Sequence, residues 1–73
     1  MNIADLAPNL IVQDGRTTLK VSTIYGPDEV TASVVLPVPP RTTVRRYNGA
    51  QVALWRPVSN QVYRRYCEAY SAR

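Results

Sequence analysis

An alternation of apolar and polar side chains between Glu29 and Leu36 is the feature that most restricts how this chain can fold. Every second position there is apolar, namely Val30, Ala32, Val34 and Leu36. Successive side chains of a strand point to opposite faces, so this period of two predicts a strand over 29–36 with one buried face. Because one strand cannot bury that face alone, the chain is predicted to form a sheet.

Turn signals on either side of this strand predict its connections. Asp14-Gly15 favours a tight hairpin, which we place at 10–25 with Leu19, Val21 and Tyr25 on its buried face. Gly26-Pro27-Asp28 predicts the next turn. After the strand, three prolines remove backbone donors and predict an extended Pro-rich crossover over 37–41. Its spacing also resembles a ligand of an SH3-type groove, but a structural linker is the favoured interpretation.

The dipeptide Asn48-Gly49 predicts a second hairpin over 42–55, because both residues tolerate the positive φ of a two-residue turn. In that pairing we expect Val52 and Leu54 to point inward. Val44 and Trp55 are then expected to be partly exposed beside Arg46.

A C-terminal helix is predicted over 59–72, with Ser59 as its N-cap. Its apolar stripe, three turns long, consists of Val62, Tyr63, Tyr66, Cys67 and Tyr70. The position of Cys67 on this stripe indicates a core residue rather than a nucleophile.

Together these elements predict a small α+β, mostly β, domain that spans residues 1–73. It has about five short antiparallel strands, which form a curled sheet or an open SH3-like barrel, and one C-terminal α-helix. A flat sheet with the helix across one face is the alternative. A chain of 73 residues buries only about 60% of its unfolded surface, which leaves room for a single core.

The composition argues against an enzyme. The chain has no histidine and one cysteine, and its three glycines fall in predicted turns rather than in a phosphate-binding loop. We therefore expect no catalytic, cofactor or metal site. No apolar segment reaches the roughly 18–20 residues of a membrane helix, and the N-terminus has no signal-like core, so we expect a cytoplasmic protein without a membrane partner.

The charges are unevenly distributed along the chain. Residues 1–40 carry two basic and four acidic side chains, a net charge of −2, whereas residues 41–73 carry seven basic and one acidic, a net charge of +6. Eight of the nine basic residues are arginine, whose planar, bidentate guanidinium suits phosphates, carboxylates and aromatic faces. A GC-rich coding sequence produces the same arginine bias with no binding role.

From this distribution we predict a basic, aromatic partner-binding surface on the second hairpin and the exposed helix face. Its expected members are Arg41, Arg45, Arg46, Tyr47, Trp55, Arg56, Arg64 and Arg65. Arginine, tyrosine and tryptophan are enriched at interface hot spots.

The sequence thus favours a non-enzymatic protein that binds another protein, of the kind found among phage and plasmid accessory factors, as an inhibitor of a host complex or an assembly subunit. The expected partner is a protein with an acidic surface or a nucleoprotein complex, and an edge strand also allows a homodimer. The alternative is a small nucleic-acid-binding module that contacts phosphates and stacks on bases, because tyrosines alternate with arginines in both basic segments.

Overall fold

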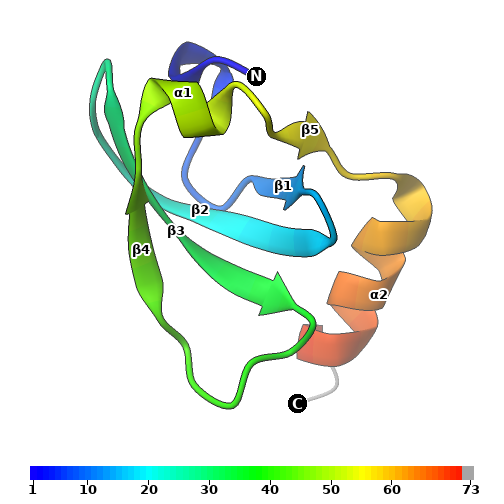
Figure 1. Ribbon diagram of the computed structural model, residues 1–73. Helices are drawn as coiled ribbons and strands as arrows, with labels where there is room; N and C mark the ends of the chain where they lie inside the picture. Colours follow the sequence, from blue (N-terminus) through cyan, green and yellow to red (C-terminus); the bar gives the residue numbers. More distant parts are fainter. Residues whose placement is uncertain (72–73) are drawn as a thin grey trace.

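A five-stranded antiparallel sheet and a C-terminal helix make up the computed structural model, which describes residues 1–71 (Figure 1). The sheet is not closed, and its strand order is β4-β3-β2-β1-β5. In chain order the elements are η1 (Ile3–Asp5), β1 (Ile11–Asp14), β2 (Thr17–Gly26), β3 (Glu29–Leu36), β4 (Val44–Tyr47), α1 (Gly49–Val52), β5 (Arg56–Pro57) and α2 (Asn60–Ser71). The prediction of a small α+β fold with five antiparallel strands and one C-terminal helix is confirmed.

The first hairpin and the third strand lie where the sequence predicts them. β1 pairs with β2 from Ile11 opposite Lys20 to Asp14 opposite Thr17. Gly15 in the connecting turn has φ +60°, a conformation that favours glycine. The strand predicted at 29–36 is β3, with those bounds.

An irregularity in β2 changes which side chains reach the core. Val21 pairs with Ala32, but Thr23 pairs with Thr31, so Ser22 is an extra residue that shifts the alternation by one. Ile24 therefore packs against the core, and Tyr25 is 64% exposed. The prediction that Tyr25 lies on the buried face is wrong for this reason.

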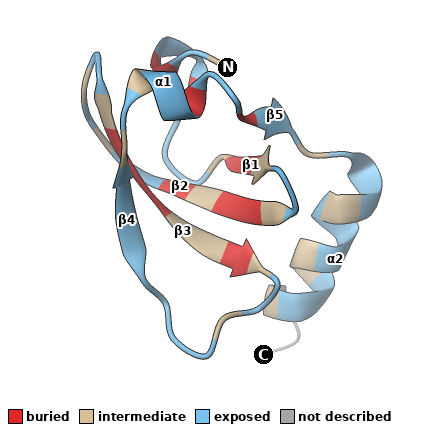
Figure 2. Ribbon diagram, viewed as in Figure 1, coloured by how far each residue is buried: buried red, intermediate tan, exposed pale blue. Residues whose placement is uncertain are grey.

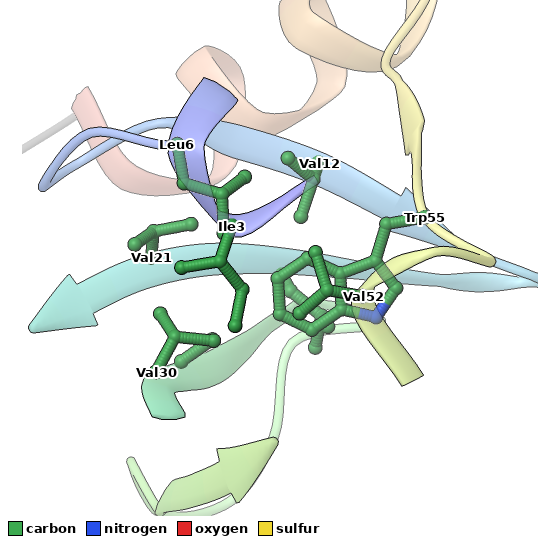
Figure 3. Packing of buried hydrophobic residues seen from close by; sticks show 9 residues of the cluster. Ile3, Leu6, Val12, Val21, Val30, Val52 and Trp55 are labelled. Carbon is green, nitrogen blue, oxygen red and sulfur yellow. The ribbon is translucent and has the colours of Figure 1, made fainter. Parts of the chain in front are cut away.

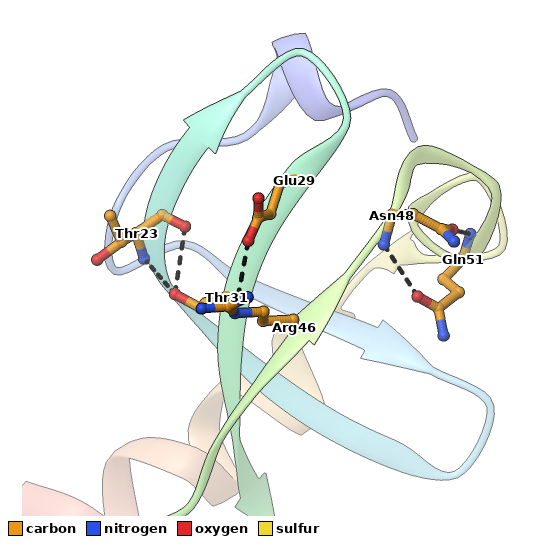
Figure 4. Close-up of polar contacts among 6 residues, drawn as sticks. All are labelled: Thr23, Glu29, Thr31, Arg46, Asn48 and Gln51. Carbon is orange, nitrogen blue, oxygen red and sulfur yellow. Dashed lines mark hydrogen bonds and ion pairs between the residues drawn. The ribbon is translucent and has the colours of Figure 1, made fainter.

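The hydroxyl of Thr31 satisfies the backbone at this irregularity (Figure 4). Thr31 Oγ1 accepts a hydrogen bond from the Thr23 amide at 3.1 Å and donates one to the Thr23 carbonyl at 3.3 Å. Thr31 is buried although it is polar, and these two bonds offset the loss of water around its hydroxyl.

The second predicted hairpin, 42–55, does not form, because Asn48 caps a helix instead of occupying a hairpin turn. Asn48 Oδ1 accepts a hydrogen bond from the Gln51 amide, and Gln51 Oε1 accepts one from the Asn48 amide, both at 2.9 Å (Figure 4). This reciprocal pair is a capping box, which begins α1 directly after β4. The Gly49 amide donates to Asp28 Oδ1 at 2.8 Å, and a Cβ at Gly49 would lie 2.8 Å from the same oxygen.

The core lies between η1, α1 and the strands, and Trp55 is its largest buried side chain (Figure 3). Val52, the last residue of α1, and Trp55, three residues later, are both buried, at 0% and 2% exposure, while Leu54 is 72% exposed. A helical turn places positions i and i+3 on one face, so the strand-based expectations of a buried Leu54 and a partly exposed Trp55 are both wrong. The core cluster comprises Ile3, Leu6, Val12, Leu19, Val21, Val30, Ala32, Val52 and Trp55.

A second register shift removes Leu36 from the core face of β3. Leu19 pairs with Val34 and Thr18 pairs with Leu36, so Val35 is an extra residue in β3. Leu36 consequently shares the face of Thr18 rather than the face of Leu19. Val35 is buried, at 5% exposure, but lies outside the core cluster.

Helix α2 covers one end of the sheet without joining the core (Figures 1 and 2). Ser59 caps it as predicted, since Ser59 Oγ accepts a hydrogen bond from the Val62 amide at 3.2 Å. The predicted stripe is only half-buried at Val62, Tyr66, Cys67 and Tyr70, and Tyr63 is 50% exposed. Tyr70 Oη donates to the Val35 carbonyl at 2.9 Å and so ties the helix to β3. Residue 72, where the predicted helix ends, lies outside the described residues.

Within residues 1–71, no helix has the length and apolar character needed to cross a membrane.

Candidate functional site

The acidic side chains near the turn between β2 and β3 are engaged in contacts within the protein. Asp28 accepts a hydrogen bond from the Gly49 amide, and Glu29 forms an ion pair with Arg46. Asp5 accepts one from the Asn2 amide in η1. In Figure 1 these segments lie at the top, and the loop of residues 37–43, called here the proline loop, lies at the bottom. Four arginines that form no ion pair with residues 1–71 gather near the proline loop, as described below.

Arg45 and Arg46, which the sequence placed on one surface, point to opposite faces of the sheet. Arg45 pairs with Ala32 of the core face, whereas Arg46 pairs with Thr31. Arg46 Nε lies 3.4 Å from Glu29 Oε2, and 81% of the Arg46 side chain is exposed. The charge of Arg46 is therefore partly balanced within the protein, whereas Arg45 forms no ion pair with residues 1–71.

Arg45 lines a hollow of about 440 Å³ between β3, β4 and the proline loop, called here the β4 hollow. Arg41 lies on the same hollow. The remaining lining is mainly apolar and consists of Val34, Pro37, Val38, Pro39, Pro40 and Thr43. Val38 is 60% exposed, so part of this apolar surface faces solvent.

A second hollow of about 320 Å³, the α2 hollow, lies between helix α2 and the end of the sheet. Arg65 of α2 and Arg16 of the β1–β2 turn line it, together with Gln13, Thr18, Leu36, Pro37 and Val62. Pro37 lines both hollows, which are therefore neighbours. Arg16, Arg41, Arg45 and Arg65 form what we call the arginine strip.

The arginine strip has no acidic counterpart in the described part of the chain. No aspartate or glutamate of residues 1–71 lines either hollow. The one ion pair found among these residues joins Arg46 and Glu29, which line neither hollow. All four strip arginines are exposed. Their positive charges are consequently available to an external partner.

Three arginines of the predicted surface lie outside the strip: Arg46, described above, Arg56 and Arg64. Arg56 of β5 is exposed and lines a separate hollow with Gln13, Asp14, Gly15 and Leu54, where a carboxylate is present. Arg64 is exposed on α2 and lines neither hollow of the strip. The predicted surface is thus divided into the strip arginines, whose hollows no carboxylate of residues 1–71 lines, and other arginines that lie outside these hollows.

The two aromatic members of the predicted surface pack together instead of facing solvent. The rings of Tyr47 and Trp55 meet edge to face, with centroids 5.0 Å apart. Trp55 is buried and Tyr47 half-buried. Burial raises the pKa of the Tyr47 hydroxyl above its ordinary value of 10.0, and the nearby charge of Arg45 offsets part of that rise. Trp55 is a core residue and offers no contact area to a partner.

Exposed aromatic surface is found on α2. Tyr63, Tyr66 and Tyr70 form a row, with ring centroids 6.1 Å and 5.2 Å apart along the helix. Tyr63 is the most exposed of the three, and Arg64 and Arg65 follow it directly.

Arg16 was not among the predicted site residues, because it is the only arginine of residues 1–40, where acidic side chains outnumber basic ones. The available indication was its position directly after Asp14-Gly15, because a residue in a tight hairpin turn lies at one end of the sheet. That end meets α2 only in the tertiary structure.

Among residues 1–71, histidine, cysteine, aspartate and glutamate side chains form no group of three that could hold a metal ion. No protein-family model, no curated protein and no solved structure matches this chain.

Proposed function

We propose that this protein is a non-enzymatic binding protein that recognises an acidic surface of another protein through the arginine strip. The observation that carries the proposal is the grouping of four exposed arginines, unpaired within residues 1–71, around two hollows that no acidic residue of that range lines. Exposed charges contribute little to folding, so this grouping is more useful for binding than for stability.

The residue types of the strip suit a protein partner. Arginine forms bidentate, charge-assisted hydrogen bonds to carboxylates. The apolar lining of the β4 hollow adds surface that an apolar side chain of the partner can cover, and specific interfaces combine such a centre with a polar rim. A phage- or plasmid-type accessory factor that inhibits a host complex, or an assembly subunit, fits this mode of action.

The architecture that supports this surface is, in our proposal, an open SH3-like barrel. Three features support it: the strands β1 to β4 follow one another in the sheet, α1 is a single short helix between β4 and β5, and β5 returns to pair with β1. Such small folds commonly use their loops and edges to bind partners.

Nucleic-acid binding is the second candidate, and the tyrosine row on α2 favours it. The half-exposed Tyr63 next to Arg64 and Arg65 combines a stacking plane with phosphate-binding charges. Against this, Trp55 is buried and unable to stack on a base.

Two arginine double variants with equal charge change test the proposal. The purified protein captures partners from lysate at about 50 and 300 mM salt, with and without nuclease. The strip variant Arg41→Gln/Arg45→Gln should lose an acidic protein partner that the wild type retains after nuclease treatment. The control Arg46→Gln/Arg64→Gln should keep it, since neither residue lines the hollows.

Recovery of nucleic acid alone, removed by nuclease and high salt, would favour the second candidate. Equal loss of the protein partner in both variants would show that net charge, and not the strip, governs binding.

A further inference from the structure

Strand β4 has a free edge directly beside the β4 hollow. It is the first strand in the order β4-β3-β2-β1-β5 and pairs only with β3 among residues 1–71. Val44, Arg45 and Arg46 are exposed. A strand edge presents unpaired backbone N–H and C=O groups, which an extended segment of another chain can bind.

The opposite edge of the sheet is a poor site for such pairing. β5 has two residues, and Pro57 has no backbone N–H to donate. β4 has four residues and contains no proline. Of the two edges, only β4 has this length, and alternate residues of it direct their backbone N–H and C=O groups away from β3.

A second copy of this chain is an unsuitable occupant of the β4 edge. A two-fold antiparallel pair of β4 strands opposes residues of the same sheet face, so pairing centred on this strand places Arg45 opposite Arg45 or Arg46 opposite Arg46. Like charges directly opposite one another destabilise a strand pair. An acidic side chain of a partner opposite Arg45 replaces this repulsion with attraction.

The β4 hollow specifies a second feature of the occupant. Thr43, Arg45 and the core-facing Val34 line it, so a strand added beside β4 has one face directed toward this lining. Side chains two residues apart on an added strand share that face. If one residue of the added strand has an acidic side chain beside Arg45, the residue two positions away on the same face lies near the exposed Val38 and its neighbouring prolines. An apolar side chain suits that second position.

We propose that β4 binds an extended, acidic segment of a partner protein by strand addition, with an acidic side chain facing Arg45 and an apolar side chain two residues away in the β4 hollow. This inference rests on the proposed function and specifies how the acidic partner is held. Main-chain hydrogen bonds supply affinity, and the alternate side chains supply specificity.

Defined peptides test this mode on the full chain. The probe is a twelve-residue peptide, roughly one long strand, that repeats Glu-Ser-Val-Ser and so carries glutamate and valine on one face. The control repeats Glu-Val-Ser-Ser, which has the same composition and charge with glutamate and valine on opposite faces. A third peptide is the probe with its backbone amides methylated along both strand edges. It has no N–H groups to donate and so cannot extend a sheet.

Binding is measured by fluorescence anisotropy, and amide hydrogen exchange reports on β4. We expect the probe to bind at least about tenfold more tightly than either control peptide, a factor typical of losing a few interfacial hydrogen bonds or one well-placed side chain. We also expect it to slow exchange at amides of residues 44–47, and to weaken by about tenfold on Arg41→Gln/Arg45→Gln but much less on Arg46→Gln/Arg64→Gln.

Three results would overturn strand addition. Equal binding of the methylated peptide without β4 protection, still dependent on Arg41 and Arg45, would leave acidic recognition standing and remove only the binding mode. Protection of β4 that rises with protein concentration in the absence of peptide would identify a second copy as the occupant. Absence of binding by all three peptides would overturn the inference, whatever the lysate capture shows.

Discussion

The rings of Tyr47 and Trp55 meet edge to face at 5.0 Å, with their planes inclined at 73°. Tyr47 is the last residue of β4, and Trp55 follows α1, so this contact joins the residues on either side of α1, within the segment that the sequence presented as a hairpin. Two side chains predicted to bind a partner instead connect β4 to the core.

Trp55→Ala should lower the free energy of unfolding by about 3–5 kcal/mol, because it leaves a large cavity in the centre of the core. Leu54→Ala is the matched control, since Leu54 is 72% exposed, and its effect should stay within about 0.5 kcal/mol. Urea unfolding followed by circular dichroism measures both. A larger cost for Leu54→Ala than for Trp55→Ala would contradict the helical turn that places these residues.

Asn48→Ala should cost about 0.5–2 kcal/mol, because it removes the side-chain acceptor that caps α1. Asn48→Asp should retain most of the stability, since its carboxylate also accepts the Gln51 amide. Asn60→Ala provides the control at an exposed position that begins α2. If Asn48→Gly were the more stabilising replacement and Asn48→Asp the more damaging, the residue would be acting as a turn former instead.

Stability should fall as the pH rises above about 10, because burial raises the pKa of Tyr47 in the folded protein. Below its ordinary pKa of 10.0 the hydroxyl stays protonated in both states and contributes no pH dependence. Above it the unfolded chain loses this proton first, which favours unfolding by up to about 1.4 kcal/mol per pH unit. Urea unfolding of the wild type and Tyr47→Phe between pH 8 and pH 11, roughly one to two units around that value, isolates this contribution. Identical slopes for the two proteins would contradict it.

Tyr70→Phe should loosen helix α2 with little effect on the core. It removes the hydrogen bond to the Val35 carbonyl, which is worth about 0.5–1.5 kcal/mol. Amide exchange in α2 should accelerate more than exchange in β2 and β3. Tyr63→Phe is the control, because no hydrogen bond of the Tyr63 hydroxyl is seen within the described residues.

Tyr66→Ala should also cost less than the roughly 2–5 kcal/mol of a fully buried side chain, since Tyr66 is only half-buried.

Arg41→Gln/Arg45→Gln should leave the free energy of unfolding within about 0.5 kcal/mol of the wild type, as expected for exposed charges. Thermal unfolding by circular dichroism checks this before any binding experiment. A marked drop in the melting temperature would assign these arginines a structural role and remove the basis of the arginine strip.

Local patterns in the sequence were sufficient to predict the first hairpin, strand β3 and helix α2. Asp14-Gly15, the alternation over 29–36 and the cap at Ser59 each act through neighbouring residues, so their effects can be read without knowledge of the fold. Asn48-Gly49 was misinterpreted because the same dipeptide suits a hairpin turn and a helix N-cap. Gln51, three residues after Asn48, was the available signal for the cap.

The sequence by itself determined strands β1 to β4, the terminal helix and the excess of arginine in the second half of the chain, because each depends on composition or short-range periodicity. Only the tertiary structure decided which side chains are buried at positions 24, 25, 54 and 55, since one extra residue in a strand or one helical turn reverses the faces. It likewise decided the arginine strip. Arg16 and Arg65 are distant in the chain and line one hollow, whereas the adjacent Arg45 and Arg46 point apart because neighbouring strand residues face opposite sides of a sheet.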